Sequence, residues 1–320
     1  MTNFAIVALK LKQTFFFKRL VFVLMLLLPL ISSAQISEVR FRHISNEQGL
    51  SNSTILCTFQ DSRGFIWFGT RDGLNRYDGV KVTIYKNDPK NIYSISDNFI
   101  RCIFEDDNHK LWIGTTYGLN KFDPITDKFI VYRHTKNKKT IAADLITGVC
   151  GAGGHNLWIA TLGGGLDKLD IYTGVFKHFV NKKNQSNSLS CDSINYIYAD
   201  TRKNLWVATQ NGLDLLKPGE STFSTFNINS IKGVSTNGIN SVAQDHSGNL
   251  WLGTTNNGVV VYNPDTKATR LFSYNEKDAN GISSNFIVTL LGDREGNMWV
   301  GTLNRGFNLY NPKTRAAYQT

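Results

Sequence analysis

Residues 111–123, LWIGTTYGLNKFD, read as a β-strand, a glycine turn and a second strand, and residues 67–78, WFGTRDGLNRYD, repeat nearly the same run. The tryptophans extend the pattern along the whole chain. They occupy positions 67, 112, 158, 206, 251 and 299, which are 45, 46, 48, 45 and 48 residues apart. Periods of this length are typical of proteins built from stacked supersecondary units.

Each period has the same order of elements. An apolar run such as 55–59, ILCTF, predicts a buried strand, and a D-x-x-G turn such as 61–64 follows it. Asp at the first turn position can accept backbone hydrogen bonds, and Gly at the fourth tolerates a positive φ. The strand with Trp comes next, with Gly or Ala two residues on and then Thr. A glycine turn, a strand usually ending in an aromatic-Asp or aromatic-Asn pair, and an outer strand complete four strands per unit.

A four-stranded sheet of this size cannot bury both of its faces alone, but repeated radially it packs against its neighbours. The sequence therefore predicts an all-β fold, a β-propeller of four-stranded blades, over residues 35–320. The Trp, the small residue two positions on and the Tyr or Phe of the third strand are expected in the core. The blades are expected near residues 53–86, 98–132, 144–179, 193–226, 238–273 and 285–320.

Residues 39–51, VRFRHISNEQGLS, resemble the stretches between blades, so the chain is expected to begin with an outer strand. The count is six complete blades plus one N-terminal closing strand. We interpret this as an incomplete seven-bladed ring whose remaining strands lie beyond residue 320. The alternative is a six-bladed ring in which residues 39–44 displace or extend beyond the last outer strand.

Residues 1–34 have the pattern of a signal peptide. Four Lys and Arg precede the uncharged run 20–31, and SSAQ follows, which predicts cleavage between Ala34 and Gln35. An uncleaved signal anchor is the alternative. Removal would lower the formal net charge from +10 to 31 minus 25, or +6. No block of Lys and Arg suited to nucleic-acid phosphates is present, so nucleic acid is not an expected partner, while weak attraction to anionic glycans stays open.

Residues suited to catalysis or metal binding do not form a recognisable motif. The cysteines at 57, 102, 150 and 191 would permit two disulfides, but each lies in or beside an apolar run, which favours free buried thiols. The six histidines are scattered over different phases of the repeat and no metal-ligand spacing occurs. We predict no catalytic residue, no metal and no cofactor.

The turns after each Gly/Ala-Thr pair vary in sequence while their flanks do not. They are expected on one face of the ring, where loops held by a rigid scaffold carry function. Their hydrogen-bonding and stacking side chains suit sugars, and solvated turn residues are the alternative. The candidate ligand-binding residues are Arg71, Tyr117, Gln210, Asn257 and Arg305.

The repeat D-x-x-G-x-[LIM]-W-[IVL]-G-T-x-x-G-[LV]-x-x-Y-[DN] resembles the two-component regulator propeller repeat, and the resemblance covers residues 38–320. That family fills the periplasmic sensor region of hybrid two-component histidine kinases typical of Bacteroidetes. It implies a sensor of polysaccharide breakdown products, inner-membrane associated within a longer chain. Its partners would be an oligosaccharide, the remainder of a sensor kinase, or a second copy in a dimer.

The resemblance also implies a second propeller, a later membrane span, a kinase core and a receiver, and none of these is recognisable in residues 1–320. We therefore expect no enzymatic output from these residues. Two other classes stay open. A secreted interaction scaffold would be a closed, independently stable ring, and a propeller lyase or hydrolase would need His and Glu side chains that converge within about 3 Å in the central cleft.

Overall fold

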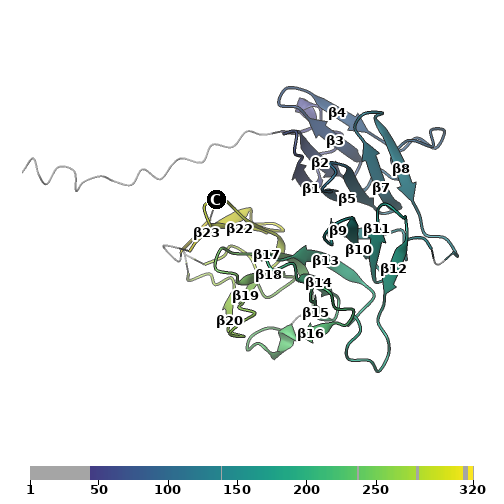
Figure 1. The fold of residues 1–320 in the computed structure, drawn as a ribbon. Helices are drawn as coiled ribbons and strands as arrows, with labels where there is room; N and C mark the ends of the chain where they lie inside the picture. Colours follow the sequence, from purple (N-terminus) through teal and green to yellow (C-terminus); the bar gives the residue numbers. More distant parts are fainter. Residues whose placement is uncertain (1–43, 138, 236–237, 279–280, 313–315, 320) are drawn as a thin grey trace, which may run out of the picture. The chain divides into compact units, whose positions relative to one another are not determined.

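The computed structural model describes residues 44–320 except 138, 236–237, 279–280, 313–315 and 320. The expected signal peptide, residues 1–34, lies outside the described residues, and so does nearly all of the expected closing strand, 39–44. The described part contains six antiparallel four-stranded sheets, in each of which the strands lie side by side in chain order (Figure 1). The predicted all-β propeller architecture with six four-stranded blades is confirmed.

We number the sheets as blades 1 to 6 in chain order. Blade 1 contains β1 (Ile55–Gln60), β2 (Ile66–Thr70), β3 (Gly73–Tyr77) and β4 (Val82–Tyr85). Blade 2 contains β5 (Ile100–Glu105), β6 (Leu111–Thr115), β7 (Gly118–Asp123) and β8 (Lys128–Tyr132). Blade 3 contains β9 (Ile146–Gly151), β10 (Asn156–Thr161), β11 (Leu166–Asp170) and β12 (Phe176–Phe179).

Blade 4 contains β13 (Ile194–Ala199), β14 (Leu205–Thr209), β15 (Gly212–Leu216) and β16 (Ser224–Phe226). Blade 5 contains β17 (Ile239–Gln244), β18 (Leu250–Thr254), β19 (Val259–Tyr262) and β20 (Thr269–Phe272). Blade 6 contains β21 (Ile287–Gly292), β22 (Met298–Thr302), β23 (Phe307–Asn311) and β24 (Ala316–Gln319). Two single-turn 3₁₀ helices, η2 (Asn46–Gln48) and η3 (Ile228–Ser230), lie in loops.

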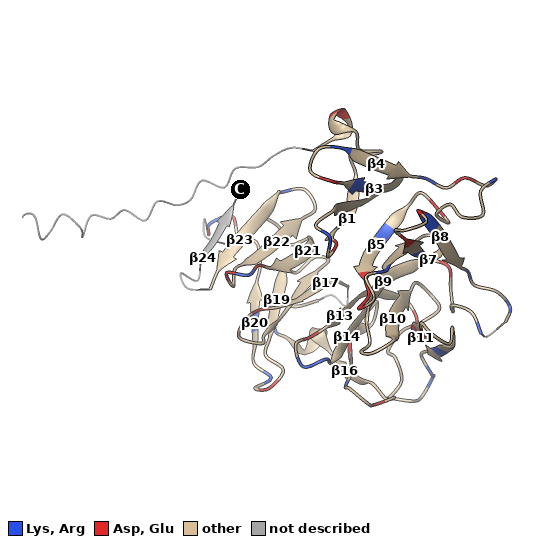
Figure 2. Cartoon of the chain, turned by 45° about the horizontal axis from the view of Figure 1, so that its top comes forward, with Lys and Arg blue, Asp and Glu red and all other residues tan. Residues whose placement is uncertain are grey.

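The blades pack face to face in chain order. The first strand of each blade contacts the first strand of the next, from β1 through β5, β9, β13 and β17 to β21. The second strand of each blade also contacts the first strand of the next. In Figure 2 the positions of Lys and Arg (blue) and of Asp and Glu (red) are dispersed along strands and loops, as the sequence indicated for the charge.

A small residue in the second strand lets neighbouring blades approach closely. A Cβ added at Gly69 would lie 2.7 Å from Ile100 of the next blade, and one added at Gly114 would lie 2.7 Å from Ile146. Since these distances are far below van der Waals contact, the repeated Gly or Ala is a packing requirement. The isoleucine that enters this space is the first residue of the next blade's first strand.

The aromatic core was predicted correctly for most blades. The tryptophans of blades 1, 2, 4 and 5 are buried, while Trp158 and Trp299 are only partly buried. In five blades the indole Nε1–H donates to the Asp that opens the preceding turn, for example Trp112 to Asp106 Oδ2 at 2.8 Å. Blade 3 has Ala152 at that position. The turn Asp therefore ties its hairpin to the core as well as closing the turn.

The four cysteines are free, as the sequence favoured, and each is partly buried. Burial raises the pKa of the Cys102 and Cys150 thiols to about 12 and raises that of Cys57 further. These thiols are therefore neutral near pH 7, and they pack as small hydrophobic side chains at the junctions of the first blades.

Candidate functional site

The five candidate residues occupy the turns between the second and third strands of five blades. Each turn is fastened in the same way, because a turn N–H donates to the carbonyl just before its blade's first strand, as Arg71 N–H does to Thr54 O at 3.3 Å. Gln210 N–H donates equivalently to Ser193 O at 3.1 Å. The turns therefore lie at corresponding ends of the blades, which we call the turn face. The D-x-x-G turns lie at the opposite ends.

Two of the candidate side chains make aromatic–cation pairs. The Tyr117 ring is 53% exposed and lies 4.1 Å from the guanidinium carbon of Arg133, which follows the outer strand of the same blade. In blade 6 the roles are reversed, since the Arg305 guanidinium lies 5.7 Å from the Tyr274 ring. An exposed aromatic ring beside a fixed cation offers a stacking surface and hydrogen-bond donors at one place.

Arg71 and Gln210 are exposed, but Asn257 is held by the protein. Its Oδ1 accepts a hydrogen bond from Ser235 N–H at 3.2 Å, and its Nδ2 donates to Gly233 O at 3.1 Å. These bonds fasten the loop that enters blade 5. Asn257 therefore has a structural task that the other four candidates do not share.

The same loop is fastened differently in the other blades, by a buried polar residue in the third strand that sequence reasoning missed. In blade 1, Ser51 N–H donates to Asn75 Oδ1 at 2.8 Å, and Asn75 Nδ2 donates to Ser51 Oγ at 2.9 Å. The equivalent residue in blade 5 is Val260, which explains why Asn257 takes over there. The position is visible in the sequence as the second residue after the turn glycine: Asn75, Asn120, Asp167, Asp214, Val260 and Asn308.

Two of these buried residues are carboxylic acids. Asp167 and Asp214 have no exposed surface, and burial raises the pKa of both carboxyls. Asp167 Oδ1 lies 2.6 Å from His178 Nδ1, and Asp214 Oδ1 accepts from Thr225 Oγ1 at 2.6 Å. The hydrogen bonds offset part of the cost of burying these groups.

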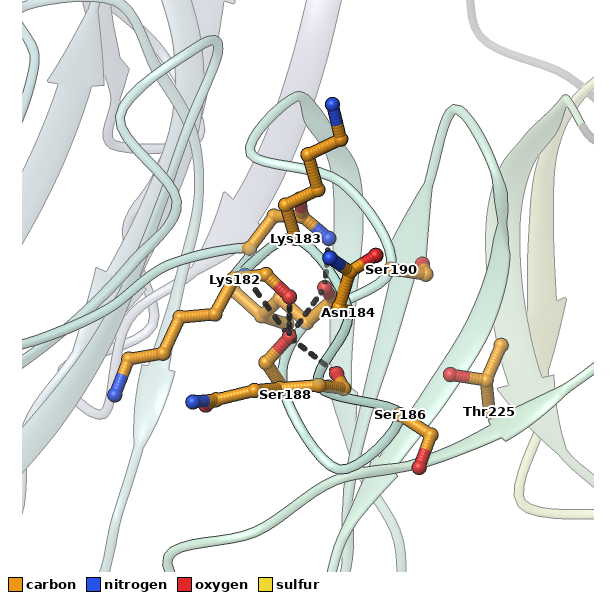
Figure 3. Close-up of a pocket in the computed structure, with 10 residues that line it drawn as sticks. Lys182, Lys183, Asn184, Ser186, Ser188, Ser190 and Thr225 are labelled. Atoms are coloured by element: carbon orange, nitrogen blue, oxygen red, sulfur yellow. Dashed lines mark hydrogen bonds between the residues drawn. The ribbon is translucent and has the colours of Figure 1, made fainter.

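A depression of about 510 Å³ lies along the loop between blades 3 and 4. Figure 3 shows Lys182 and Lys183 projecting from the loop and Ser188 hydrogen-bonded within it. Ser188 Oγ donates to Gln185 O at 2.9 Å and accepts from Lys182 N–H at 3.0 Å. The lining is polar, and none of the five candidate residues belongs to it: Asn181, Lys182, Lys183, Asn184, Gln185, Ser186, Ser188, Leu189, Ser190 and Thr225.

The described residues contain one His–Glu contact, at the end of the blades opposite the turn face. His109 Nδ1 lies 3.7 Å from Glu105 Oε1, and Ser62 Oγ lies within hydrogen-bond distance of both. This separation exceeds the distance that the lyase or hydrolase hypothesis requires. Over the described ranges, no group of three or more His, Cys, Asp or Glu is placed to hold a metal ion. The helices within those ranges include none that is long and apolar enough to span a membrane.

The fold and the repeat define a class of protein, a β-propeller whose four-stranded blades share one sequence repeat. The family model described as two component regulator propeller matches residues 49–72, 94–117, 188–211, 233–256 and 281–304. Each match runs from the loop before a first strand into the turn that carries the candidate residue. Five of the six blade repeats therefore match the two-component regulator propeller family model.

Solved structures of similar sequence are extracellular domains. The extracellular domain of the putative hybrid two component system BT3049 from B. thetaiotaomicron is 25% identical, with a TM-score of 0.72 over 86% of this chain and 36% of that one. The extracellular domain of BT4673 from the same organism, described as a putative one component or hybrid two component system, is 27% identical, with a TM-score of 0.71 over 88% of this chain and 38% of that one.

A curated relative is the histidine kinase P4 of Formosa agariphila, which is 40% identical over 73 residues, 23% of this chain and 5% of the relative. The present chain therefore spans little more than a third of the solved extracellular domains and a small part of the kinase. Virginiamycin B lyase from Staphylococcus aureus shares the fold, at 14% identity and a TM-score of 0.58.

Proposed function

We propose that this chain is the periplasmic ligand-sensing propeller of a hybrid two-component regulator of polysaccharide utilisation. A signal peptide, residues 1–34, would export it, and the enzymatic output would lie elsewhere in a longer sensor kinase. The observation that carries the proposal is the similarity, over more than four fifths of the chain, to extracellular domains of two-component systems. Its partners would be an oligosaccharide, the rest of the kinase and a second copy.

We assign ligand recognition to the turn face, at Arg71, Tyr117, Gln210, Asn257 and Arg305. Exposed Tyr117 beside Arg133 supports this assignment, because sugar rings stack on aromatic faces and their hydroxyls accept hydrogen bonds from guanidinium groups. Asn257 would contribute by holding the loop that borders the face.

Ring closure by a seventh blade is part of the proposal. The residue that opens each first strand is Ile in all six blades; it is fully buried in blades 2 to 6, but Ile55 of blade 1 is 37% exposed. Correspondingly, the three atoms nearest to a Cβ added at Gly301 of blade 6 all belong to Thr289 of its own blade. In a six-bladed ring Ile55 would be buried against Gly301. Residues 39–44 and sequence beyond residue 320 would supply the seventh blade.

The test of ligand recognition is calorimetric titration of the purified protein with a panel of plant and host oligosaccharides. Tyr117→Ala should weaken binding about tenfold, the loss of roughly 1.4 kcal/mol of stacking. The matched control is Tyr172→Ala, since Tyr172 is 65% exposed in the turn between β11 and β12, at the opposite end of the blades. Equal binding by both variants would exclude the turn face as the ligand-binding surface. If no oligosaccharide of the panel bound the protein, oligosaccharide sensing would be refuted.

A second experiment tests the sensor assignment itself. An antibody against residues 35–320 should detect, in fractionated source cells, an inner-membrane protein far larger than this chain. A soluble periplasmic band of the chain's own size would instead support a stand-alone scaffold.

A further inference from the structure

Every first strand contains a β-bulge immediately after its opening isoleucine. The pairing with the second strand shifts register there in all six blades, for instance between Ile55 and Cys57 in blade 1. A bulge redirects the extra residue's side chain and is over-represented near functional sites. We call the six bulged residues the bulge ring: Leu56, Arg101, Thr147, Asn195, Asn240 and Val288.

The bulge ring lies at the turn-face end of the blades. Each opening isoleucine pairs with the Thr that ends the second strand, as Ile100 pairs with Thr115, and the turn begins directly after that Thr. The bulged residue is the next residue in the chain. The bulge ring is therefore the inner continuation of the surface that carries the candidate ligand-binding turns.

Two members of the ring show what the position can do. Asn195 Nδ2 donates to Ile239 O at 3.3 Å, and Asn240 Nδ2 donates to Ile287 O at 2.9 Å. In both cases the side chain reaches the first strand of the next blade, at the residue before that blade's own bulge. The side chains of Asn195 and Asn240 thus lie where neighbouring first strands meet, and a polar group there can hydrogen-bond to the next blade.

Arg101 and Thr147 are not satisfied in this way. Within the described part of the chain, Arg101 Nε and Thr147 Oγ1 are the two buried side-chain nitrogen or oxygen atoms without a hydrogen-bond partner. They occupy the same repeat position in adjacent blades 2 and 3, whose first strands are in contact. Burying an unpaired donor or hydroxyl is unfavourable, and a ligand that supplied the missing acceptor would recover this cost.

The guanidinium carbon of Arg101 lies 6.0 Å from the centroid of the Phe99 ring. None of the ion pairs formed by the described residues includes Arg101. The titratable side chains that interact with it electrostatically include the thiols of Cys57 and Cys102, and both are neutral because burial raises their pKa. Arg101 as a whole residue is partly exposed, although its Nε atom is buried.

We propose that Arg101 and Thr147 bind an anionic group, a carboxylate or a sulfate, of a ligand whose remainder lies on the turn face. The guanidinium Nε–H and the threonine hydroxyl would both donate to its oxygens, and the hydrogen bond from the guanidinium would be charge-assisted. This inference rests on the proposed function and narrows the ligand to acidic sugars, such as uronic acids or sugar sulfates.

The experiment compares glucose, glucuronate and glucose 6-sulfate as probes of the purified protein. Binding is followed by calorimetry and by the ¹⁵N–¹H signal of the Arg101 Nε–H group, assigned through its loss in Arg101→Lys. Glucuronate or glucose 6-sulfate should bind at least about tenfold more tightly than glucose, since a hydrogen bond to a charged group contributes that much. The tighter of the two acids identifies the group that the site prefers.

Variants separate charge from structure. Thr147→Val, which removes only the hydroxyl, should weaken binding of the acidic sugar about tenfold, and Thr147→Ser should restore it. Arg101→Gln should abolish the preference for acids over glucose. Arg294→Gln, which removes one exposed positive charge from the turn between β21 and β22 at the opposite end, should leave binding unchanged.

Equal affinity for glucose and glucuronate, or an Arg101 signal that no acidic probe moves, would overturn the inference while leaving the sensor proposal intact. If no sugar binds but inorganic sulfate shifts the Arg101 Nε–H signal, the anion site stands and oligosaccharide sensing fails. Unfolding curves for each variant establish that a loss of binding is not a loss of fold.

Discussion

Replacing Asp106 with Ala should destabilise the protein by about 3 kcal/mol. The carboxylate accepts three hydrogen bonds, from Asn108 N–H at 2.9 Å, from Lys110 N–H at 3.0 Å and from the Trp112 indole at 2.8 Å. The two backbone groups lie in an exposed turn and can turn to water, so each loss costs about 0.5–1 kcal/mol. The indole of Trp112 is completely buried, so its stranded donor costs a further 1–3 kcal/mol or so.

A double-mutant cycle isolates the buried bond. Trp112→Phe removes the indole donor, so in the Asp106→Ala background it should cost about 1–2 kcal/mol less than in the parent protein. Equilibrium urea denaturation followed by circular dichroism measures all four free energies of unfolding. Asp107→Ala is the matched control, because Asp107 is exposed in the same turn and its loss should change stability by no more than about 0.5 kcal/mol.

Two outcomes would refute this reasoning. One is an Asp106→Ala variant as stable as the Asp107→Ala variant. The other is strict additivity of the Asp106 and Trp112 substitutions, which would mean that the indole finds another partner or water and that the turn Asp serves the turn alone.

Two further predictions concern packing and pH. Gly69→Ala should destabilise the protein by about 1–3 kcal/mol in urea denaturation, because its Cβ would lie 2.4 Å from Cys57 Sγ and 2.7 Å from Ile100 of the next blade. Gly301→Ala should cost less, because in the described residues the atoms nearest to its Cβ belong to Thr289 of its own blade. Asp214→Asn should raise stability at neutral pH and make stability less dependent on pH. Burial raises the pKa of the Asp214 carboxyl, so the folded protein binds that proton more tightly than the unfolded chain does. The stability that this proton contributes is complete below the ordinary Asp pKa and is lost as the pH rises through the pKa of the folded state. Thermal unfolding from pH 3 to 8 measures this, and an unchanged or steeper profile would contradict it.

The blades could be predicted from the sequence because the repeat shows which positions are apolar and which are small. These positions determine how the sheets pack against one another. The sequence did not reveal the buried Asn75 position, since a polar residue directly after the apolar Leu74 reads as the exposed side of an alternating strand. Only the structure shows that blades cover both faces of that strand and that the amide fastens a loop. Trp299 was expected in the core but is only partly buried. The burial of this side chain depends on a neighbouring blade as well as on its own sequence.

The bulge ring escaped sequence reasoning for a different physical reason. A bulge adds one residue to a strand without changing the apolar pattern on either side. The apolar periodicity of the sequence therefore does not show which side chain the bulge redirects. Arg101 and Thr147 occupy the same repeat position as Asn195 and Asn240 but carry different side chains. Whether the side chain forms a hydrogen bond depends on whether it reaches the next strand. An amide can bridge to the next strand's carbonyl, whereas a guanidinium and a hydroxyl at the neighbouring junctions leave a donor without an acceptor.

The contacts between neighbouring blades also determine how stable the set of blades is. Each internal junction seats an isoleucine against a Gly or Ala of the preceding blade, so stability accumulates junction by junction, as in other repeat proteins. Ile55 has no such seat in the described residues, and burying the rest of its side chain would contribute up to about 1 kcal/mol. A segment that covered the open faces of blades 1 and 6 would therefore stabilise the ring. A ligand that contacts turns on both sides of that seam would bind the closed ring more tightly than the open one, which couples ligand binding to closure.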